Sequence, residues 1–279
     1  MELRRTDMFN KIKRDDNIFK SELFLQDAIA FNVMISIIEN IVRYPTPKIF
    51  SNGRDCIIVN SDPEHPVIVW TADSFKDYEG VFHFVDSEFK NNNPFKIMSK
   101  MELYNFLNAR NKVDNSNKKI LGAYQCKNLN DIEYVGRADN ITREEISVVA
   151  GLIALFGKET GENVGTEENI VSDAESFINN PLNKVWRDTN NKIVALARIR
   201  ITEKYARTGL VITDVNERGK SYAKMLVHFL AQHAMNIGKT PVIFTDFDYV
   251  PSNKCYRAVG YELRSTLANY ELKKPQSVD

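Results

Sequence analysis

The sequence predicts a mixed α/β protein of the α+β type, built from two domains. Runs rich in β-branched and aromatic residues recur along the chain, and segments with helical spacing of apolar residues interrupt them. Turn residues such as Asn-Gly and Asp-Pro separate the runs. A chain of 279 residues, 43% of them hydrophobic, is nearer in size to two modest domains than to one large domain.

The first domain is expected to open with one amphipathic helix over Phe24–Arg43, where apolar residues follow helical spacing until two prolines end the pattern. Strands are predicted at Asp55–Asn60, Pro66–Ala72 and Gly80–Asp86, because these runs are rich in strand-forming residues and are bounded by turns. Helical spacing returns at Ser99–Arg110. The order of elements is therefore helix, strands, helix.

The domain boundary is predicted near residue 130. Asn111–Lys119 is polar and is interpreted as a loop, and a short strand is predicted at Ile120–Cys126 before polar residues return at Lys127–Asp131. We therefore expect an amino-terminal α+β domain at 1–130 and a second domain at 131–279.

The second domain is expected to begin with a strand at Ile132–Arg137. Thr142 and Glu145 then stand at the spacing of a capping box, which satisfies the first amides of a helix predicted over Ile146–Phe156. Another helix is predicted at Glu167–Ile178. The strands that should follow form a meander, at Asn183–Asp188, Ile193–Thr202 and Arg207–Thr213.

Charge and cysteine usage exclude several kinds of partner. Lys+Arg and Asp+Glu are equal at 37 each, so no net field would attract nucleic acid or an acidic membrane. Cys56, Cys126 and Cys255 lie far apart without histidines at ligand spacing, so neither a disulfide framework nor a metal site is expected. No stretch is apolar enough to span a bilayer. These features favour a cytoplasmic protein.

A strand, a loop and a helix start follow one another at residues 207–238. The strand Arg207–Thr213 runs into the loop Asp214–Ser221, and a helix follows until Gly238. The amides and the positive dipole end of such a helix start suit a pyrophosphate, and Arg218 and Lys220 add charge. A solvated turn would have the same local sequence.

The same loop contains Gly219-Lys220-Ser221, which also occurs in phosphate-binding loops of NTPases. The NTPase motif requires a further glycine at position 214, where this chain has Asp214, whose carboxylate would face the phosphates. The NTPase interpretation is therefore the weakest of the three.

Two segments resemble the GNAT superfamily of acyltransferases. Val211–Ala223 is similar to its acetyl-CoA-binding motif, an Arg-x-x-Gly-x-Ala pattern that closes a splayed strand, and Ser252–Tyr261 is similar to its Ser-Asn-x-x-Tyr-x-x-x-Gly-aromatic segment. The resemblance covers the carboxy-terminal half. It implies a mixed, mostly antiparallel sheet flanked by helices, and an acetyl-CoA-dependent N-acetyltransferase in which a primary amine attacks the thioester directly. Ser221 departs from the pattern, because the family usually has Gly there.

The resemblance also implies which residues bind the coenzyme. Main-chain groups of Val211 and Thr213 would contact the pantetheine arm and thioester, and Asn253 would contact the coenzyme or cap a helix, while capping is the expected role of Ser252. The pyrophosphate would lie on the amides of Arg218, Gly219, Lys220, Ser221, Tyr222 and Ala223.

Tyr256 matches the family tyrosine that donates to the coenzyme A sulfur, and a phenol can hydrogen-bond and protonate a thiolate. Packing in the core is the competing interpretation. The general base is less clearly marked: Asp246 and Glu203 each end a strand, and ordered water could serve instead. His228 and His233 are assigned no chemistry, since His233 falls on the apolar face of its helix.

The resemblance does not choose the acceptor, which is expected to be a small-molecule or peptide amine. The helix, strands, helix order of residues 1–130 loosely echoes the second half, so a degenerate GNAT-like repeat stays open there. A coenzyme-A-binding sensor or interaction protein without catalysis is the main alternative function. The protein is expected to be a monomer or a homodimer.

Overall fold

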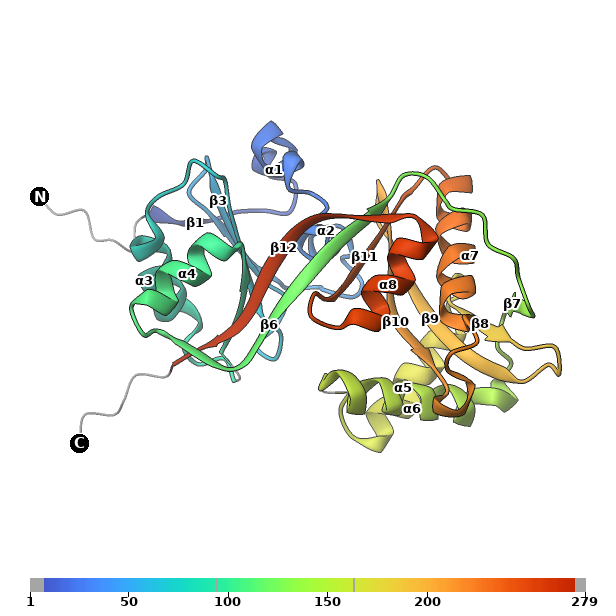
Figure 1. The fold of residues 1–279 in the computed structure, drawn as a ribbon. Helices are drawn as coiled ribbons and strands as arrows, with labels where there is room; N and C mark the ends of the chain where they lie inside the picture. The colour runs from blue at the N-terminus through green and yellow to red at the C-terminus, as the bar shows by residue number, and fades with distance from the viewer. Residues whose placement is uncertain (1–7, 94, 163, 274–279) are drawn as a thin grey trace, which may run out of the picture. The chain divides into compact units, whose positions relative to one another are not determined.

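A computed structural model describes residues 8–93, 95–162 and 164–273 of the chain. The chain divides into two compact units, which are called unit 1 and unit 2 below. Unit 2 consists of Tyr124–Phe244 and Tyr249–Leu263, and unit 1 of the segments before, between and after these two. Strands β6 (Val113–Cys126) and β12 (Tyr261–Leu272) each run from one unit into the other, as Figure 1 allows the reader to follow. Neither unit is therefore one continuous segment.

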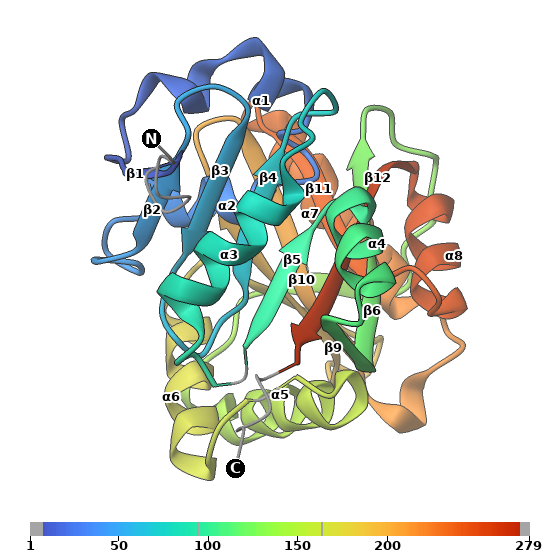
Figure 2. The ribbon, with the colours of Figure 1, turned by 90° about the vertical axis from the view of Figure 1, so that its left-hand side faces the viewer.

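The sheet of unit 1 has the strand order β1-β2-β3-β4-β5-β12-β6, of which β12 and β6 belong to this unit over part of their length. From β1 to β12 in this order, neighbouring strands are antiparallel except β4 and β5, which are parallel. Helices α3 and α4 cover one face of this sheet, where their side chains share a core with β3, β4 and β5 (Figure 2). The bounds are Asn10–Lys11 (β1), Asn17–Lys20 (3-10 helix), Glu22–Gln26 (α1), Asn32–Glu39 (α2), Lys48–Ser51 (β2), Cys56–Asn60 (β3), Val67–Thr71 (β4), Tyr78–Phe89 (α3), Lys96–Ser99 (β5) and Met101–Ala109 (α4).

The strand predicted at Gly80–Asp86 is wrong, because this segment lies inside helix α3. The Asp77 side chain accepts from the Gly80 amide at 2.9 Å and caps the helix start. Its buried residues recur at helical spacing, at Val81, Phe84, Val85 and Phe89. The strand-forming residues that favoured a strand here therefore belong to a helical pattern.

The single helix predicted over Phe24–Arg43 is also wrong, because α1 and α2 are separate helices. Asp27, between them, accepts from Trp70 Nε1 at 2.8 Å and its carboxylate lies 2.5 Å from Lys100 Nζ. A carboxylate held by these two partners fixes the chain between the helices. The guanidinium of Arg14 donates to the carbonyl of Ile37 at 2.6 Å and so satisfies the end of α2.

The polar stretch Asn111–Lys119 is not a loop, since strand β6 begins at Val113. Its side chains are exposed from Asn115 to Lys118, and Tyr104 donates to the side chain of Asn115 at 2.9 Å. Hydrogen bonds along a strand join backbone groups, so an exposed strand needs no apolar alternation. The composition of this segment therefore gave no strand signal.

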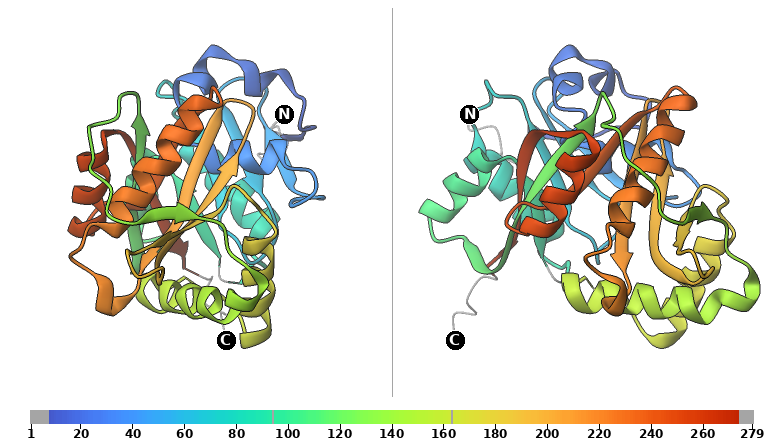
Figure 3. Two further views of the ribbon diagram at one scale, coloured as in Figure 1. Left: turned by 90° about the vertical axis from the view of Figure 1, so that its right-hand side faces the viewer. Right: turned by 45° about the vertical axis from the view of Figure 1, so that its right-hand side comes forward.

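The sheet of unit 2 has the strand order β11-β10-β9-β8-β7, in which only β10 and β11 are parallel. Helices α5 and α6 pack on one face and α7 on the other, and Figure 3, left, shows α7 in orange alongside the strands. The bounds are Arg137–Asp139 (β7), Arg143–Glu145 (3-10 helix), Ile146–Thr160 (α5), Glu167–Ile178 (α6), Lys184–Arg187 (β8), Ile193–Ile201 (β9), Tyr205–Thr213 (β10), Val215–Glu217 (3-10 helix), Tyr222–Asn236 (α7), Thr240–Asp246 (β11) and Val250–Val259 (α8).

Most predicted elements of unit 2 are confirmed, and α6 has the predicted bounds. The predicted strand Ile132–Arg137 is wrong, because β7 begins only at its last residue. Gly136 has a φ of 90° and passes so close to β8 that an added Cβ would meet the Arg187 carbonyl at 2.1 Å. The mixed, mostly antiparallel sheets flanked by helices confirm the predicted fold class.

Candidate active site

Strands β10 and β11 run side by side for only part of their length. Their parallel register begins at Tyr205 opposite Thr240 and reaches Thr208 opposite Ile243. β10 continues beyond this paired segment to Thr213. The last residues of β10 thus lie beyond the end of the parallel ladder. There the two strands diverge, which is called a splay.

A β-bulge shapes the splayed part of β10. The register between β10 and β9 shifts between Gly209 and Ile212, and Leu210 has a φ of 49°, in the left-handed region. The side chain of Val211 packs against the cores beneath α7 and α8. The Thr213 carbonyl accepts from the Arg218 guanidinium at 3.4 Å. Both residues predicted to offer main-chain groups therefore lie on a distorted strand end.

The loop between β10 and α7 holds two residues in the left-handed region. Gly219 has a φ of 79° and Ser221 has a φ of 66°. Ser221 is the residue before the helix and its hydroxyl makes no capping hydrogen bond. Glycine adopts such a φ freely, whereas a residue with a Cβ loses about 1 kcal/mol or more. The family glycine that Ser221 replaces thus coincides with a positive φ.

The basic side chains of the loop are paired with carboxylates. Arg218 Nη2 lies 2.6 Å from Glu159 Oε1, and Lys220 Nζ lies 2.8 Å from Glu217 Oε2. Lys192 Nζ lies 2.8 Å from the other oxygen of Glu217, and hydrogen bonds from the two lysines lower the pKa of this carboxyl to about 2. The positive charge predicted for this rim is therefore largely matched by acidic side chains.

The last two residues of the predicted coenzyme loop belong to α7. Tyr222 is buried and packs with Trp186 and Ala195 in the core beneath the helix, and Ala223 is half-buried. Only their main-chain amides are therefore suited to a ligand. The first amides of a helix have no partner within the helix, so the loop offers a row of donors.

Tyr256 lies on α8 in an aromatic and aliphatic core. Its exposed fraction is 6%, and its ring centroid is 6.3 Å from that of Tyr261. Burial raises the pKa of the Tyr256 hydroxyl well above its usual value. The hydroxyl therefore keeps its proton and is able to donate a hydrogen bond.

The side chain of Asn253 is fully engaged within unit 2. Its oxygen accepts from the Tyr124 hydroxyl at 2.5 Å, and its nitrogen donates to the Tyr249 carbonyl at 2.8 Å. The capping role expected for Ser252 is wrong, because Tyr249 is the residue before α8 and Ser252 lies within the helix. The Ser252 hydroxyl donates to the Tyr249 carbonyl at 3.1 Å instead.

The two carboxylates considered as general bases lie at chain turns. Asp246 is the last residue of β11, in the segment 245–248 that groups with unit 1, and it accepts from the Asp248 amide at 3.0 Å. Glu203 is exposed in the turn between β9 and β10. Neither position identifies a base by its geometry.

The sequence pointed to His233 as the buried histidine of α7, whereas His228 is the buried one. His228 Nε2 lies 3.0 Å from the Asn130 carbonyl and Nδ1 lies 2.6 Å from the Tyr134 hydroxyl. Because a carbonyl only accepts, Nε2 carries the hydrogen. Burial lowers the pKa of His228. The ring borders a cavity of about 510 Å³ that contains none of the predicted site residues and is lined mainly by residues 129–134 and α7.

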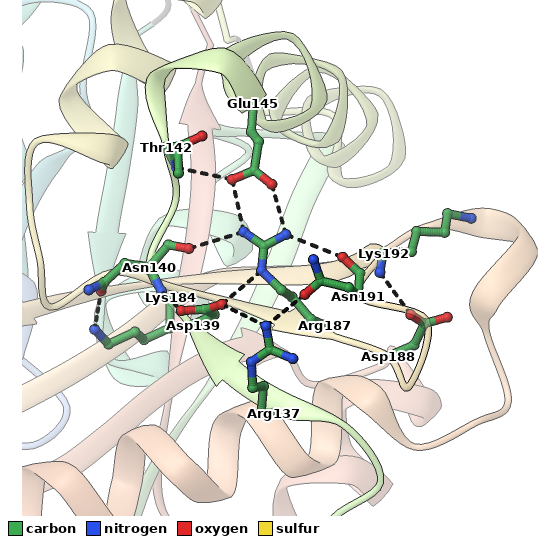
Figure 4. A network of polar contacts seen from close by, with 10 residues as sticks. All are labelled: Arg137, Asp139, Asn140, Thr142, Glu145, Lys184, Arg187, Asp188, Asn191 and Lys192. Carbon is green, nitrogen blue, oxygen red and sulfur yellow. Dashed lines mark hydrogen bonds and ion pairs between the residues drawn. The ribbon is translucent and has the colours of Figure 1, made fainter.

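A polar network on β7, β8 and the start of α5 centres on Arg187, which Figure 4 shows among its partners. The guanidinium lies 2.7 Å from Glu145 Oε1 and 2.9 Å from Asp139 Oδ2, and its side chain is 7% exposed. Glu145 is also the second member of the capping box with Thr142. The network holds elements together and includes no predicted site residue.

Two further properties concern metal-ligating side chains and the length and polarity of the helices. In residues 8–93, 95–162 and 164–273, no group of three or more metal-ligating side chains gathers at one point. In the same ranges, every helix is too short or too polar to cross a membrane.

This chain resembles known proteins in part of its sequence and in its fold. Residues 149–261 match the model of the acetyltransferase (GNAT) family, so this part of the chain carries a GNAT acetyltransferase domain, as the two sequence motifs predicted. No curated protein matches the sequence.

Solved structures extend the similarity over both units. An acetyltransferase of the GNAT family from Colwellia psychrerythraea has a TM-score of 0.57 at 15% identity, with 95% of this chain and 99% of that chain covered. A GCN5-related N-acetyltransferase from Sphaerobacter thermophilus has a TM-score of 0.65 at 12% identity, with 98% of each chain covered. A tandem GNAT protein from the clavulanic acid biosynthesis pathway has a TM-score of 0.56 at 11% identity, with 96% and 99% covered. At these identities the likeness concerns the fold.

Proposed function

We propose that this protein transfers an acetyl group from acetyl-CoA to a primary amine. The observation that carries the proposal is the splay of β10 from β11 after Thr208, which leads through two left-handed residues into the uncapped start of α7. This arrangement offers main-chain groups along a strand end and amides at a helix start, which suit the extended arm and the pyrophosphate of coenzyme A. Residues 149–261 match the GNAT family, which supports the same cofactor.

In this proposal, the coenzyme is held mainly by backbone. Val211 and Thr213 offer main-chain groups to the pantetheine arm and thioester, and the amides of Arg218–Ala223 bind the pyrophosphate. Bound acetyl-CoA supplies an acetyl group that is already activated as a thioester. The protein's task is then to orient the thioester and the amine and to assist the departing sulfur.

Tyr256 is the residue proposed to serve that sulfur. Because its pKa is raised above 10 while a thiol has a pKa near 8.5, complete proton transfer from the phenol to the thiolate is unfavourable. We therefore assign Tyr256 the role of a hydrogen-bond donor to the departing sulfur. Asn253 positions Tyr256, since its bonds to Tyr124 and Tyr249 fix the first turn of α8. The amine proton leaves through Asp246 or through ordered water.

The test combines coenzyme binding with turnover. Calorimetry with coenzyme A measures binding, and release of free thiol from acetyl-CoA in the presence of a panel of amines measures transfer. Replacing Tyr256 by Phe should lower kcat by roughly 10²-fold and leave the coenzyme dissociation constant within about twofold. Binding without turnover with any amine contradicts the proposed reaction.

Coenzyme binding without catalysis is the second candidate function. It is favoured by the deep burial of Tyr256 and by the engagement of Asn253 within the protein. It predicts that Tyr256→Phe alters neither coenzyme binding nor any regulatory effect of the coenzyme. An NTPase is less favoured, because Asp214 stands where the motif needs glycine and accepts from the Asn216 amide at 2.9 Å.

Further parts of the proposal concern the setting of the reaction. We propose a small-molecule or peptide amine as acceptor, and a cytoplasmic protein that is a monomer or homodimer. We also propose a domain boundary near residue 130 of the sequence. Coverage of both units by a tandem GNAT structure supports a GNAT-like origin for residues 1–130.

A further inference from the structure

One asparagine in unit 2 joins α7 to α8, the helix that carries Tyr256. Asn130 lies in the irregular chain between β6 and β7. Its carbonyl accepts from His228 Nε2 on α7 at 3.0 Å. Its amide donates to the Val259 carbonyl at 3.0 Å, and its side-chain nitrogen donates to the Ala258 carbonyl at 3.2 Å. Asn130 thus bridges the middle of α7 and the last turn of α8.

The end of α8 also packs closely against the chain around Asn130. Gly260 ends α8 with a φ of 115°, and a Cβ added to it would meet the Asn128 carbonyl at 2.2 Å. A contact this close leaves room only for a glycine. Tyr256 begins the last turn, so Asn130 bonds to residues that directly follow it. Because Asn253 fixes the first turn of the same helix, α8 is held at both ends.

Tyr134 sets the protonation of the His228 ring. Its hydroxyl donates to His228 Nδ1 at 2.6 Å, so the neutral ring carries its hydrogen on Nε2, which faces Asn130. The Tyr134 and His228 rings meet edge to face with their centroids 5.6 Å apart, and His228 is 7% exposed. Burial lowers the pKa of His228, which favours the neutral ring. His228 is therefore prepared to donate to Asn130.

These contacts connect the two ends of the proposed coenzyme site. The start of α7 offers its amides to the pyrophosphate, whereas Tyr256 on α8 serves the sulfur. A hydrogen-bond donor acts only within about 3 Å of its acceptor, so the placement of α8 against α7 matters for the departing sulfur. We propose that Asn130 and His228 are positioning residues, which hold α8 against α7 and so keep the Tyr256 hydroxyl where it serves the sulfur. This inference rests on the proposed acetyl transfer.

A double-mutant cycle separates this role from general support of the fold. Asn130→Ala should lower kcat about fivefold, measured as thiol release from acetyl-CoA with the amine of the panel that reacts fastest. The dissociation constant of coenzyme A should stay within about twofold. In the Tyr256→Phe background, Asn130→Ala should lower kcat by less than about twofold, because a residue that acts through Tyr256 has no effect without its hydroxyl. Asn128→Ala is the matched control and should change neither quantity, since the carbonyl of Asn128 is the group that faces Gly260.

A second measurement needs neither coenzyme nor acceptor. The Gly260 amide donates to the Arg257 carbonyl at 3.1 Å. Its hydrogen exchange in the protein alone should be at least about threefold faster in Asn130→Ala and in His228→Leu than in the wild type. His228→Gln keeps an N–H donor near the position of Nε2 and should recover part of the loss in exchange protection and in kcat. Gln232→Ala, which removes an exposed side chain one turn further along α7, should change neither.

Equal losses of kcat from Asn130→Ala in the wild-type and Tyr256→Phe backgrounds overturn the positioning role and leave acetyl transfer intact. Unchanged exchange of the Gly260 amide in Asn130→Ala also overturns it. Turnover that Tyr256→Phe does not lower removes the donor role of Tyr256 and this inference, again without affecting acetyl transfer. Coenzyme A binding without turnover of any amine by the wild type overturns acetyl transfer and the inference together.

Discussion

Two helix starts in unit 2 are built in opposite ways. The 3-10 turn that leads into α5 is closed by side chains, since Thr142 and Glu145 form a capping box and Arg187 holds Glu145 from β8. The start of α7 has no side-chain cap, and the residue before it, Ser221, has a positive φ. The first amides of a capped helix are hydrogen-bonded within the protein, whereas those of an uncapped helix can bind a ligand. The difference separates a structural joint from the proposed coenzyme site on the same sheet.

The largest expected effect is at the closed start. Replacing Arg187 by Leu leaves Glu145 and Asp139 without their buried partner, so the free energy of unfolding should fall by about 3 kcal/mol, measured by urea denaturation. Arg137→Gln is the matched control, because Arg137 also pairs with Asp139 but its side chain is 58% exposed. It should cost less than about 1 kcal/mol. Equal losses in the two variants would mean that the network does not hold the joint.

A smaller effect is expected at the open start. Ser221→Gly removes the strain of a Cβ at a φ of 66°, which exceeds the extra flexibility that glycine gives the unfolded chain. The free energy of unfolding should rise by about 0.5–1 kcal/mol, and coenzyme A should bind more tightly in calorimetry. Ser221→Ala keeps the Cβ and removes the hydroxyl, so it should change neither. A gain in the alanine variant would locate the effect in the hydroxyl.

Low pH should weaken the contacts of Glu145 at the start of α5 and so lower the free energy of unfolding. The hydrogen bonds from Arg187 hold the pKa of Glu145 below its usual value near 4.5. A carboxyl with a lowered folded-state pKa contributes stability that is complete above the unfolded-state value and is lost as pH falls through the folded-state value. The unfolding free energy should therefore drop more steeply below about pH 4.5 in the wild type than in Glu145→Gln. Parallel pH profiles from denaturation at each pH would refute this.

The smallest effect is expected from the carboxylates that face the loop lysines. Glu217 pairs with Lys192 and Lys220, so it competes with an incoming phosphate for both. Glu217→Gln should tighten coenzyme A binding roughly two- to fivefold and make the affinity fall more steeply with salt. Glu133→Gln, remote from the loop in the lining of the cavity beside His228, should leave both unchanged. Weaker binding in Glu217→Gln would show that the carboxylate supports the loop instead.

The sequence predicts those parts of the fold whose signals are local. Helix α6 was predicted to the residue from the spacing of apolar residues within one short segment, and the structure adds that Thr166 caps it. The splay and the loop were located by two short motifs. The helical pattern of α3 was taken for a strand because its residues are rich in strand formers. The strand predicted at Ile120–Cys126 is the second half of β6, and only the polar first half of β6 was missed.

The side-chain pairing across unit 2, at the candidate site and outside it, could not be predicted. Arg187 and Glu145 are 42 residues apart, and Arg218 and Glu159 are 59 apart, so no local pattern links them. The choice of His228 over His233 depends on a modest rotation of α7 that the spacing of apolar residues leaves open. The neighbourhood of Arg200 and Arg207 follows only from the pairing of β9 with β10, which the spacing of residues along the sequence does not reveal.

Strand β12 has a consequence for how the protein is made. Its residues 268–271 pair with β5, which lies about 170 residues earlier in the chain. During synthesis, β5 therefore keeps an unpaired edge until residues 268–271 have left the ribosome, and exposed edges of this kind favour aggregation. A fragment that ends near residue 130 would lack this strand, so the amino-terminal part should be expressed with residues 261–272 supplied, for example by circular permutation.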